Sequence, residues 1–477
     1  MKTNSRLLVP FILCMVATTA CGLLPKAIAP LAAPTAVVTA GPTLESVASK
    51  NLITQMDFSS VSQETITISP DGRRIAFVAN QGDGIVVNID GMWEGPYDAE
   101  KLLVFSPDSQ HLAYMAKRGN QMFVVVDGQP GNSYDEADNP HFSPDSQHMA
   151  YSAKNRNHWM AVVDGQEGKS YEDVYIADSS FSPDSQHIAY RVIQGNQQTL
   201  VVDDGEVRTY EGIGAQAILY SADSQHLAYV AQEGKTQFVV RDGQRGRSYD
   251  LIRTDPPMIF SADGQHLAYI AKTGDKRFVV VDGQETETAY EEVLTVRLSP
   301  DGEHVAYLAR NGDRWVVVVD GKEGNSYEGL GDGSLQFSPD SQSITYTAFQ
   351  NDKWFVVVGA QELESYDQAG IPVFSPDGGQ MAYLGVSGNS QFIVVEGQPQ
   401  KAYDLVGNPV FSSEGGHLAY VARMGDKRFV VVDGQTGESY DFIFNSSQGG
   451  VYFDSASRFH YLALRGDKVY LIEEKLE

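Results

Sequence analysis

Apolar and polar positions alternate along this chain in short runs that recur every 37 to 40 residues. One copy, starting at Phe105, reads FSPDSQHLAYMAKRGNQMFVVVDGQPGNSYDEA. Within it, HLAYMA alternates in polarity and FVVVDG is dense in β-branched residues, and both features favour β-strands. The repeats contain no run with helical spacing. The pattern therefore predicts short strands joined by tight turns along most of the chain.

The recurring landmark is the turn Ser-Pro-Asp-(Ser/Gly), in which proline presets φ and the aspartate bonds the backbone ahead of it. Intact or degraded, the turn occurs eleven times, with its acid at Asp71, Asp108, Asp145, Asp184, Asp223, Asp263, Asp301, Asp340, Asp377, Glu414 and Asp454. Self-similarity at this period is typical of stacked repeats, in which no unit buries both of its faces alone.

Each copy divides into four strands, a to d. Strand a ends at the apolar residue before Ser-Pro-Asp, strand b is HLAYMA, and strand c is FVVVDG. Strand d is the Ser-Tyr-Asp segment after an Asp-Gly-Gln-x-Gly hairpin turn. Four antiparallel strands per unit indicate a propeller blade. The predicted fold is therefore an all-β β-propeller of about eleven four-stranded blades, over residues 46–477.

The number of blades leaves two arrangements open. Single propellers usually have roughly four to eight blades, which favours two packed rings with a split near residue 255 over one large ring. No Pro/Gly linker separates the copies, which weighs against two rings. The last copy stops after strand c, and residues 51–56 are expected to supply the missing outer strand and close the ring.

The repeat core SPDG-x-x-(I/L)-A-(F/Y), as in residues 69–77, resembles the WD40-like (PD40) repeats of TolB-type and prolyl-oligopeptidase propellers. The resemblance covers residues 60–475 and implies a propeller, without implying a particular function. TolB-like proteins add an N-terminal α/β domain and the peptidases add a hydrolase domain, and this sequence has room for neither.

The first 45 residues predict export. Residues 1–6 carry two bases and no acid, and the apolar run at 7–17 is too short to span a bilayer. The segment Thr-Thr-Ala before Cys21 resembles the lipobox of bacterial lipoproteins, although the family usually has Leu where Thr18 stands. That resemblance implies a signal peptide over 1–20 and a lipid on Cys21, which holds the protein on the periplasmic or extracellular face of the cell envelope.

An ordinary signal peptide is the alternative, but its best cleavage motif, Ala-Ile-Ala at 27–29, is followed by a disfavoured proline. Residues 21–45, rich in Ala, Pro and Thr, are interpreted as a tether between the membrane and the propeller.

Composition narrows the possible functions. The 477 residues include 35 Lys+Arg and 62 Asp+Glu, for a net charge of −27, and only two cysteines. So acidic a chain is not expected to bind nucleic acid. Two cysteines exclude a disulfide scaffold and a zinc ribbon.

The blade ends differ in charge. The a–b and c–d turns belong to one end and are acidic, whereas the b–c loops at the other end are basic and predict an anionic partner. Charges placed only for solubility are the alternative. At the start of strand c, the candidate rim-binding residues are Trp159, Trp315, Trp354, Arg277 and Arg428. They are suited to stacking on sugars or gripping a peptide, or else to packing between blades.

The residue before the strand-a aromatic should face the channel, because side chains alternate along a strand. This rule gives the candidate channel-lining residues His141, Ser180, Arg297 and Gln336. Polar residues are ordinary in a wet channel, which is the alternative interpretation.

Seven histidines lie three residues after the turn acid, one per copy, and copying explains them better than a metal ring does. No catalytic motif, metal site or cofactor site is predicted. The favoured hypothesis is therefore a non-catalytic scaffold for an envelope protein or glycan. An enzyme that acts on envelope glycans or peptides through the channel, and a surface filler with no ligand, are the alternatives.

Overall fold

The computed structural model describes residues 49–476 except 83, 178, 256–257 and 446–448. The predicted signal peptide, Cys21 and the whole of the predicted tether lie outside these residues. Within the described part of the chain, no helix is long and apolar enough to cross a membrane.

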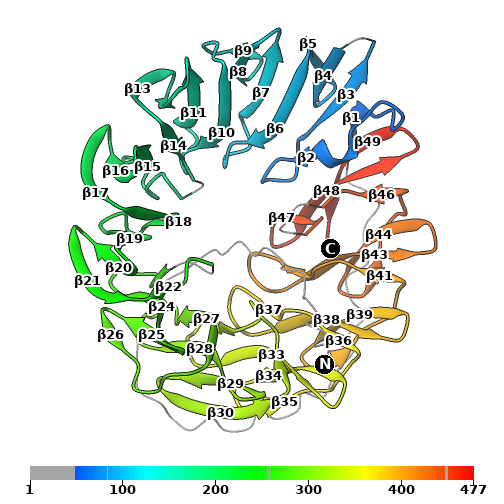
Figure 1. The fold of residues 1–477 in the computed structure, drawn as a ribbon. Helices are drawn as coiled ribbons and strands as arrows, with labels where there is room; N and C mark the ends of the chain where they lie inside the picture. Colours follow the sequence, from blue (N-terminus) through cyan, green and yellow to red (C-terminus); the bar gives the residue numbers. More distant parts are fainter. Residues whose placement is uncertain (1–48, 83, 178, 256–257, 446–448, 477) are drawn as a thin grey trace, which may run out of the picture.

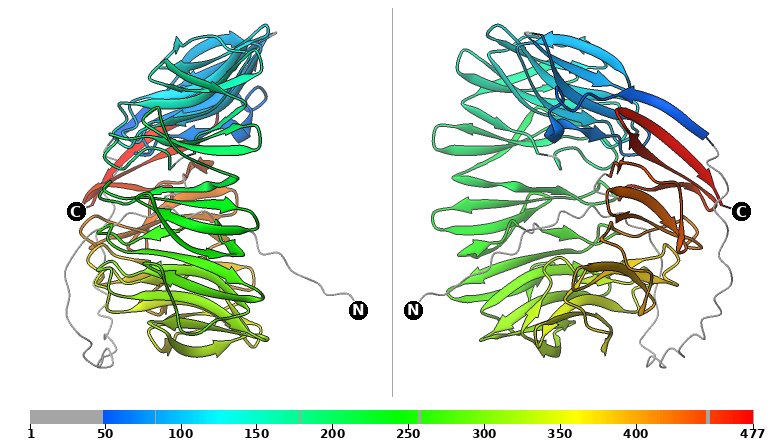
Figure 2. Two further views of the ribbon diagram at one scale, coloured as in Figure 1. Left: turned by 60° about the vertical axis from the view of Figure 1, so that its left-hand side comes forward. Right: turned by 90° about the vertical axis from the view of Figure 1, so that its right-hand side faces the viewer.

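Eleven antiparallel sheets follow one another around a single ring (Figure 1). In chain order they are blade 1 (β2–β5, 67–97), blade 2 (β6–β9, 99–130), blade 3 (β10–β13, 136–171), blade 4 (β14–β17, 173–210), blade 5 (β18–β21, 212–249), blade 6 (β22–β26, 251–285), blade 7 (β27–β30, 292–327), blade 8 (β31–β35, 329–362), blade 9 (β36–β40, 368–399), blade 10 (β41–β45, 405–436) and blade 11 (β46–β49, 442–475, with β1). The predicted propeller is confirmed, with one large ring. Figure 2 shows the blades stacked side by side around it.

The two-ring arrangement, although favoured from the sequence, is wrong. Eleven clusters of buried apolar residues lie one at each junction between neighbouring blades. The junction of blades 5 and 6, near residue 255, has the same kind of cluster as the others, built on Tyr249, Ile252, Met258 and Tyr269. Because that junction is packed rather than open, the chain continues through it without dividing.

Blade 3 shows how one copy folds. Its strands are β10 (Glu136–Phe142), β11 (Met149–Asn155), β12 (His158–Val163) and β13 (Gln166–Tyr171), paired in that order. Between β12 and β13, Asp164 and Gly165 both have positive φ, 49° and 75°, as a two-residue type I′ hairpin requires. Strand d therefore begins directly after Asp-Gly, which corrects the longer turn and later strand predicted above.

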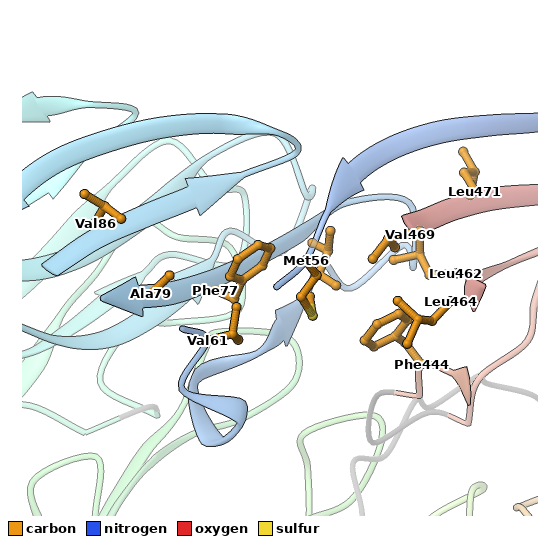
Figure 3. Packing of buried hydrophobic residues seen from close by; sticks show 11 residues of the cluster. Met56, Val61, Phe77, Ala79, Val86, Phe444, Leu462, Leu464, Val469 and Leu471 are labelled. Atoms are coloured by element: carbon orange, nitrogen blue, oxygen red, sulfur yellow. The ribbon is translucent and has the colours of Figure 1, made fainter. Parts of the chain in front are cut away.

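The chain's own N-terminal strand closes the ring. β1 (Ser49–Gln55) pairs antiparallel with β49 (Lys468–Lys475), so blade 11 takes its outer strand from the start of the chain. The prediction of this closing strand is confirmed. Figure 3 shows the apolar cluster at this junction, where Met56 and Phe77 lie between the two ends of the chain and are fully buried.

Tyrosines line the ordinary junctions between blades. At eight of the ten ordinary junctions, the strand-d tyrosine of one blade packs edge-on against the strand-b tyrosine of the next, with ring centroids 5.9–6.4 Å apart. Tyr134 and Tyr151 at the junction of blades 2 and 3 are examples, and both are buried. Burial raises the pKa of Tyr249 to about 12. The size and edge-to-face geometry of these tyrosines fill the space between sheets.

Candidate functional site

The face of the ring that carries the a–b and c–d turns, here called the turn face, is built from repeated polar contacts. In blade 2, Ser106 Oγ donates to Asp108 Oδ1 over 2.5 Å, and the same oxygen accepts the Gln110 N–H over 3.0 Å. These hydrogen bonds lower the pKa of Asp108. Asp108 is therefore ionised at neutral pH and holds its turn in shape.

A hydroxyl connects each of several turns to the turn before it. Ser146 Oγ in blade 3 accepts the backbone N–H of Asp108 in blade 2 over 3.0 Å. Ser146 has φ of 65°, a left-handed conformation that costs an ordinary residue stability. The same contact recurs in the pairs Asp71–Ser109, Asp145–Ser185, Asp184–Ser224 and Asp301–Ser341. The hydrogen bond between blades therefore offsets the local strain of the serine backbone.

The seven repeated histidines each pair with the aspartate of the c–d turn in their own blade. His111 Nδ1 lies 2.6 Å from Asp127 Oδ2, while Asp127 Oδ1 accepts the Leu112 N–H over 3.0 Å. The other pairs are His148–Asp164, His187–Asp203, His226–Asp242, His266–Asp282, His304–Asp320 and His417–Asp433. The hydrogen bond to Asp164 raises the pKa of His148. These histidines therefore fasten two turns of one blade together.

A groove of about 530 Å³ opens on the turn face between blades 2 and 3. Its apolar wall includes Val126, Pro130, Phe142 and Met149. Its polar groups include the two histidine–aspartate pairs of these blades, the turn that contains Gln147, and the side chains of Gln129 and Tyr151. The volume lies in the range of small-ligand sites, and the mixture of an apolar wall and a few polar groups suits a side chain or small molecule.

The predicted rim residues are dispersed over blades 3, 6, 7, 8 and 10 and do not form one site. All three tryptophans are half-buried. The Lys154 Nζ atom lies 5.4 Å from the Trp159 ring, the Arg310 guanidinium lies 5.3 Å from Trp315, and the ring of Phe349 packs 5.2 Å from Trp354. A side chain of the same hairpin therefore contacts each ring.

The two rim arginines reach the following blade. The Arg428 guanidinium lies 3.9 Å from the centroid of Phe442 in blade 11, and Arg277 Nη1 donates to the Glu291 carbonyl at the start of blade 7. At the same position, Gln237 Oε1 accepts the Ile252 N–H of the next blade over 2.8 Å. In blades 5, 6 and 10, this position therefore makes contacts with the following blade.

The b–c rim is less basic than its lysines and arginines suggest. Acids beside them form ion pairs, as between Lys154 Nζ and Glu136 and between Arg310 and Glu292, both 2.7 Å long. The acid after most strand-d tyrosines also accepts a backbone N–H from the next b–c turn, as Glu211 accepts that of Gly234 over 2.7 Å. The field expected to attract an anion is therefore largely neutralised at close range.

The predicted channel residues lie near the inner strands of blades 3, 4, 7 and 8. Ser180 is 1% exposed, and its hydroxyl accepts the Ala177 N–H over 2.9 Å. Gln336 donates to the Pro372 carbonyl of blade 9, and Arg297 Nη1 donates to the Val296 carbonyl over 3.0 Å. Burial lowers the pKa of Arg297. His141 is half-buried on β10.

One group of potential metal ligands stands out in the described part of the chain: Asp301, Glu303 and His304, whose ligand atoms lie within 4.8 Å of one another. His304 Nδ1 is already bonded to Asp320 over 2.7 Å, and Asp301 to Ser299. The same two contacts occur in blades 2 to 6, where a glutamine stands in the place of Glu303, so turn chemistry accounts for the group.

Sequence reasoning missed the tyrosines between blades and the groove. A tyrosine recurs at a fixed place in both strand b and strand d of almost every copy, and that regularity was available as a signal. No signal in the sequence could have predicted the groove, because it depends on which residue lies opposite in the neighbouring blade.

No known family model matches the chain. No curated protein matches its sequence either. Among solved structures, it is similar to a eukaryotic initiation factor, with 13% identity, 69% of this chain and 96% of that chain covered, and a TM-score of 0.39. TolB from Acinetobacter baumannii matches with 14% identity, 55% and 80% coverage, and a TM-score of 0.25. The Cps50 (Swd1) β-propeller domain of Myceliophteria thermophila matches with 13% identity, 60% and 99% coverage, and a TM-score of 0.26.

Proposed function

We propose that this chain is a non-catalytic binding scaffold, anchored to the cell envelope, that presents the faces of its propeller to partner proteins or glycans. The observation that carries the proposal is the repeated use of the same polar groups. Serines, histidines and aspartates of the turn face bond one another in copy after copy. Such contacts make the ring rigid. The specificity for a partner would then come from features that differ between copies, such as the open groove between blades 2 and 3.

The anchor rests on the lipobox-like residues that end at Cys21. A lipid on Cys21 would hold the propeller at the membrane through the segment that leads to β1. Several acyl chains on one cysteine anchor firmly, since each buried methylene contributes about 0.8 kcal/mol.

The test is made in cells that express the full chain. Metabolic labelling with an alkyne fatty acid should mark the wild type, and Cys21→Ser should abolish both the label and the membrane fraction of the protein. Cys14→Ser is the matched control and should change neither. Photo-cross-linking from the turn face should then capture one recurrent envelope partner. A chain that takes no label and yields no cross-linked partner would contradict the proposal.

The enzyme alternative is not favoured by the placement of its candidate residues. His141, Ser180, Arg297 and Gln336 belong to four different blades. The polar groups of Ser180 and Gln336 contact backbone atoms nearby, which is a structural use.

A further inference from the structure

At two junctions between blades, an arginine lies against the aromatic ring and the a–b turn of the following blade. Between blades 5 and 6, Arg241 ends β20 (Thr236–Arg241) and lies across the Phe260 ring, with its guanidinium carbon 5.4 Å from the centroid. Its Nη2 donates to the Gln265 carbonyl over 2.9 Å, and its Nη1 lies 3.3 Å from Asp282 Oδ1. The guanidinium thus meets an aromatic ring, a turn carbonyl and a carboxylate of the following blade.

A second arginine reaches an equivalent receptor from a different position. Between blades 1 and 2, Arg74 takes the place of the repeated histidine and lies 5.2 Å from the centroid of Phe105. Its Nη1 donates to the carbonyls of Ser109 and Gln110 over 3.0 and 2.7 Å. Its Nε pairs with Asp90 of its own blade over 2.7 Å. Two different positions in the repeat therefore deliver a guanidinium to the equivalent ring and turn of the following blade, which indicates that this ring and turn favour the group.

The groove between blades 2 and 3 has this receptor without an arginine. Phe142, Gln147 and Asp164 line it and correspond to Phe260, Gln265 and Asp282. Where Arg241 stands in blade 5, blade 2 has Val126, the last residue of β8 (Gln121–Val126). The stacked histidine is the same in both grooves: His111 on Phe142 and His226 on Phe260, each with centroids 6.4 Å apart.

The next groove along the ring differs at its outer side. Strand c of blade 3 also ends in a valine, Val163. However, blade 4 has Asp204 at the turn position that Gly165 holds in blade 3, and the Asp204 carboxylate accepts the Tyr190 hydroxyl over 3.2 Å and lies beside Gly168. The counterpart of Gly168 in blade 2 is Gly131, which lines the open groove.

We propose that the groove between blades 2 and 3 binds an arginine side chain of a partner protein. The inference deepens the scaffold role proposed above and rests on it. Arginine suits the receptor because its planar guanidinium stacks on aromatic rings and offers five donors, whereas a lysine ammonium is compact and strongly hydrated. Val126, Pro130 and Met149 offer an apolar wall to the aliphatic stem.

The test uses the full chain, purified in a mild detergent, and fluorescein-labelled Gly-Leu-Arg-Leu-Gly as the probe. Two further peptides carry citrulline or lysine in place of arginine. Citrulline retains the shape and loses the charge, and lysine retains the charge and loses the planar shape. Fluorescence anisotropy should show the arginine peptide binding at least about tenfold more tightly than either, as expected when a charged contact is lost.

Two substitutions should reverse the states of the two grooves: one fills the groove between blades 2 and 3, and the other empties the groove between blades 5 and 6. Val126→Arg should weaken binding at least about tenfold, because its own guanidinium would occupy the receptor as Arg241 does in blade 5. Since the fold already accepts arginine at this position, the variant should unfold at the same temperature as the wild type. Arg241→Val should open the groove between blades 5 and 6 and add a second binding site.

Equal binding of the arginine and citrulline peptides, or unchanged binding by a folded Val126→Arg variant, would overturn the inference. If Val126→Arg does not fold, Asp164→Asn provides the same comparison by removing the carboxylate charge. An envelope partner captured by cross-linking, together with no preference for arginine, would overturn the arginine site and leave the scaffold role standing.

Discussion

The seam between blades 11 and 1 and the ordinary junction between blades 2 and 3 solve the same packing problem with different residues. The ordinary junction packs Tyr134 on Tyr151 and adds the hydrogen bond from the Asp108 N–H to Ser146. At the seam no strand-d tyrosine is available, and Met56 packs with Phe77 and Leu462 in its place (Figure 3).

Polar contacts at the seam are specialised as well. Arg73 of blade 1 forms ion pairs with Asp454 and Glu473 of blade 11, at 2.8 and 2.9 Å. His460 Nε2 contacts the Asp71 carbonyl over 2.7 Å. Copying one repeat supplies ten junctions, but the eleventh joins the two ends of the chain and needs residues that occur once. Substitutions or deletions at the seam should therefore destabilise the ring more than changes at an ordinary junction.

Removing the closing strand should have the largest effect. Deleting residues 1–56 exposes the edge of β49 and takes Met56 out of the seam, where a buried large side chain is worth about 2–5 kcal/mol by itself. We expect a lower thermal midpoint and self-association by light scattering. Deleting residues 1–46 is the matched control and should leave a monomer of unchanged midpoint. An unchanged monomer after the longer deletion would show that β1 does not close the ring.

Truncating a tyrosine at an ordinary junction should come next. Tyr151→Ala leaves a cavity against Tyr134 and should destabilise the protein by about 3–5 kcal/mol. Tyr151→Phe retains the ring and should cost less than about 1.5 kcal/mol. Differential scanning calorimetry of the two variants compares their losses of stability. Equal losses would mean that the hydroxyl rather than the ring holds the blades together.

Substitutions of Ser146 should have a smaller effect on stability, and two of them separate the hydrogen bond from the backbone strain. Ser146→Ala loses the hydrogen bond to the Asp108 N–H while retaining the left-handed backbone, at a cost of about 1–2 kcal/mol. Ser146→Gly loses the same bond but removes the strain, so its thermal midpoint should lie between those of Ser146→Ala and the wild type. A midpoint below that of Ser146→Ala would contradict this account of the serine.

The pH dependence should be the gentlest effect. Hydrogen bonds from Ser106 and Gln110 lower the pKa of Asp108, so its contribution is present above the ordinary value of 3.8 and is lost as pH falls through the folded-state pKa. The raised pKa of His148 has the opposite sign: its contribution is present below 6.5 and is lost as pH rises through the folded-state pKa. Thermal midpoints should therefore decline below about pH 3.8 and slightly above about pH 6.5. Asp108→Asn should blunt the acidic decline, and a profile that stays flat in acid would contradict the role of the turn carboxylates.

Some features of the fold could be predicted from the sequence, and others could not. The Pro-Asp turns, the alternating strands and the closing segment at 51–56 are local signals, and each was sufficient to predict its element. The number of rings is not local, because it depends on the angle at which each blade packs on the next. The groove between blades 2 and 3 rests on Val126 standing where Arg241 stands in another copy, and this difference gains meaning only once Phe142 and Asp164 are seen across the junction.

The most direct test of the single closed ring is a disulfide across the seam. Ser49 Oγ and Glu473 Oε2 lie 2.6 Å apart on paired strands, although 424 residues separate them in sequence. In a chain with Cys14 and Cys21 replaced by serine, Ser49→Cys/Glu473→Cys should form an intramolecular disulfide under mild oxidation. The product should be a monomer that migrates faster than its reduced form in denaturing electrophoresis. Cross-linking only between molecules, or none at all, would contradict a ring of eleven blades closed by its own first strand.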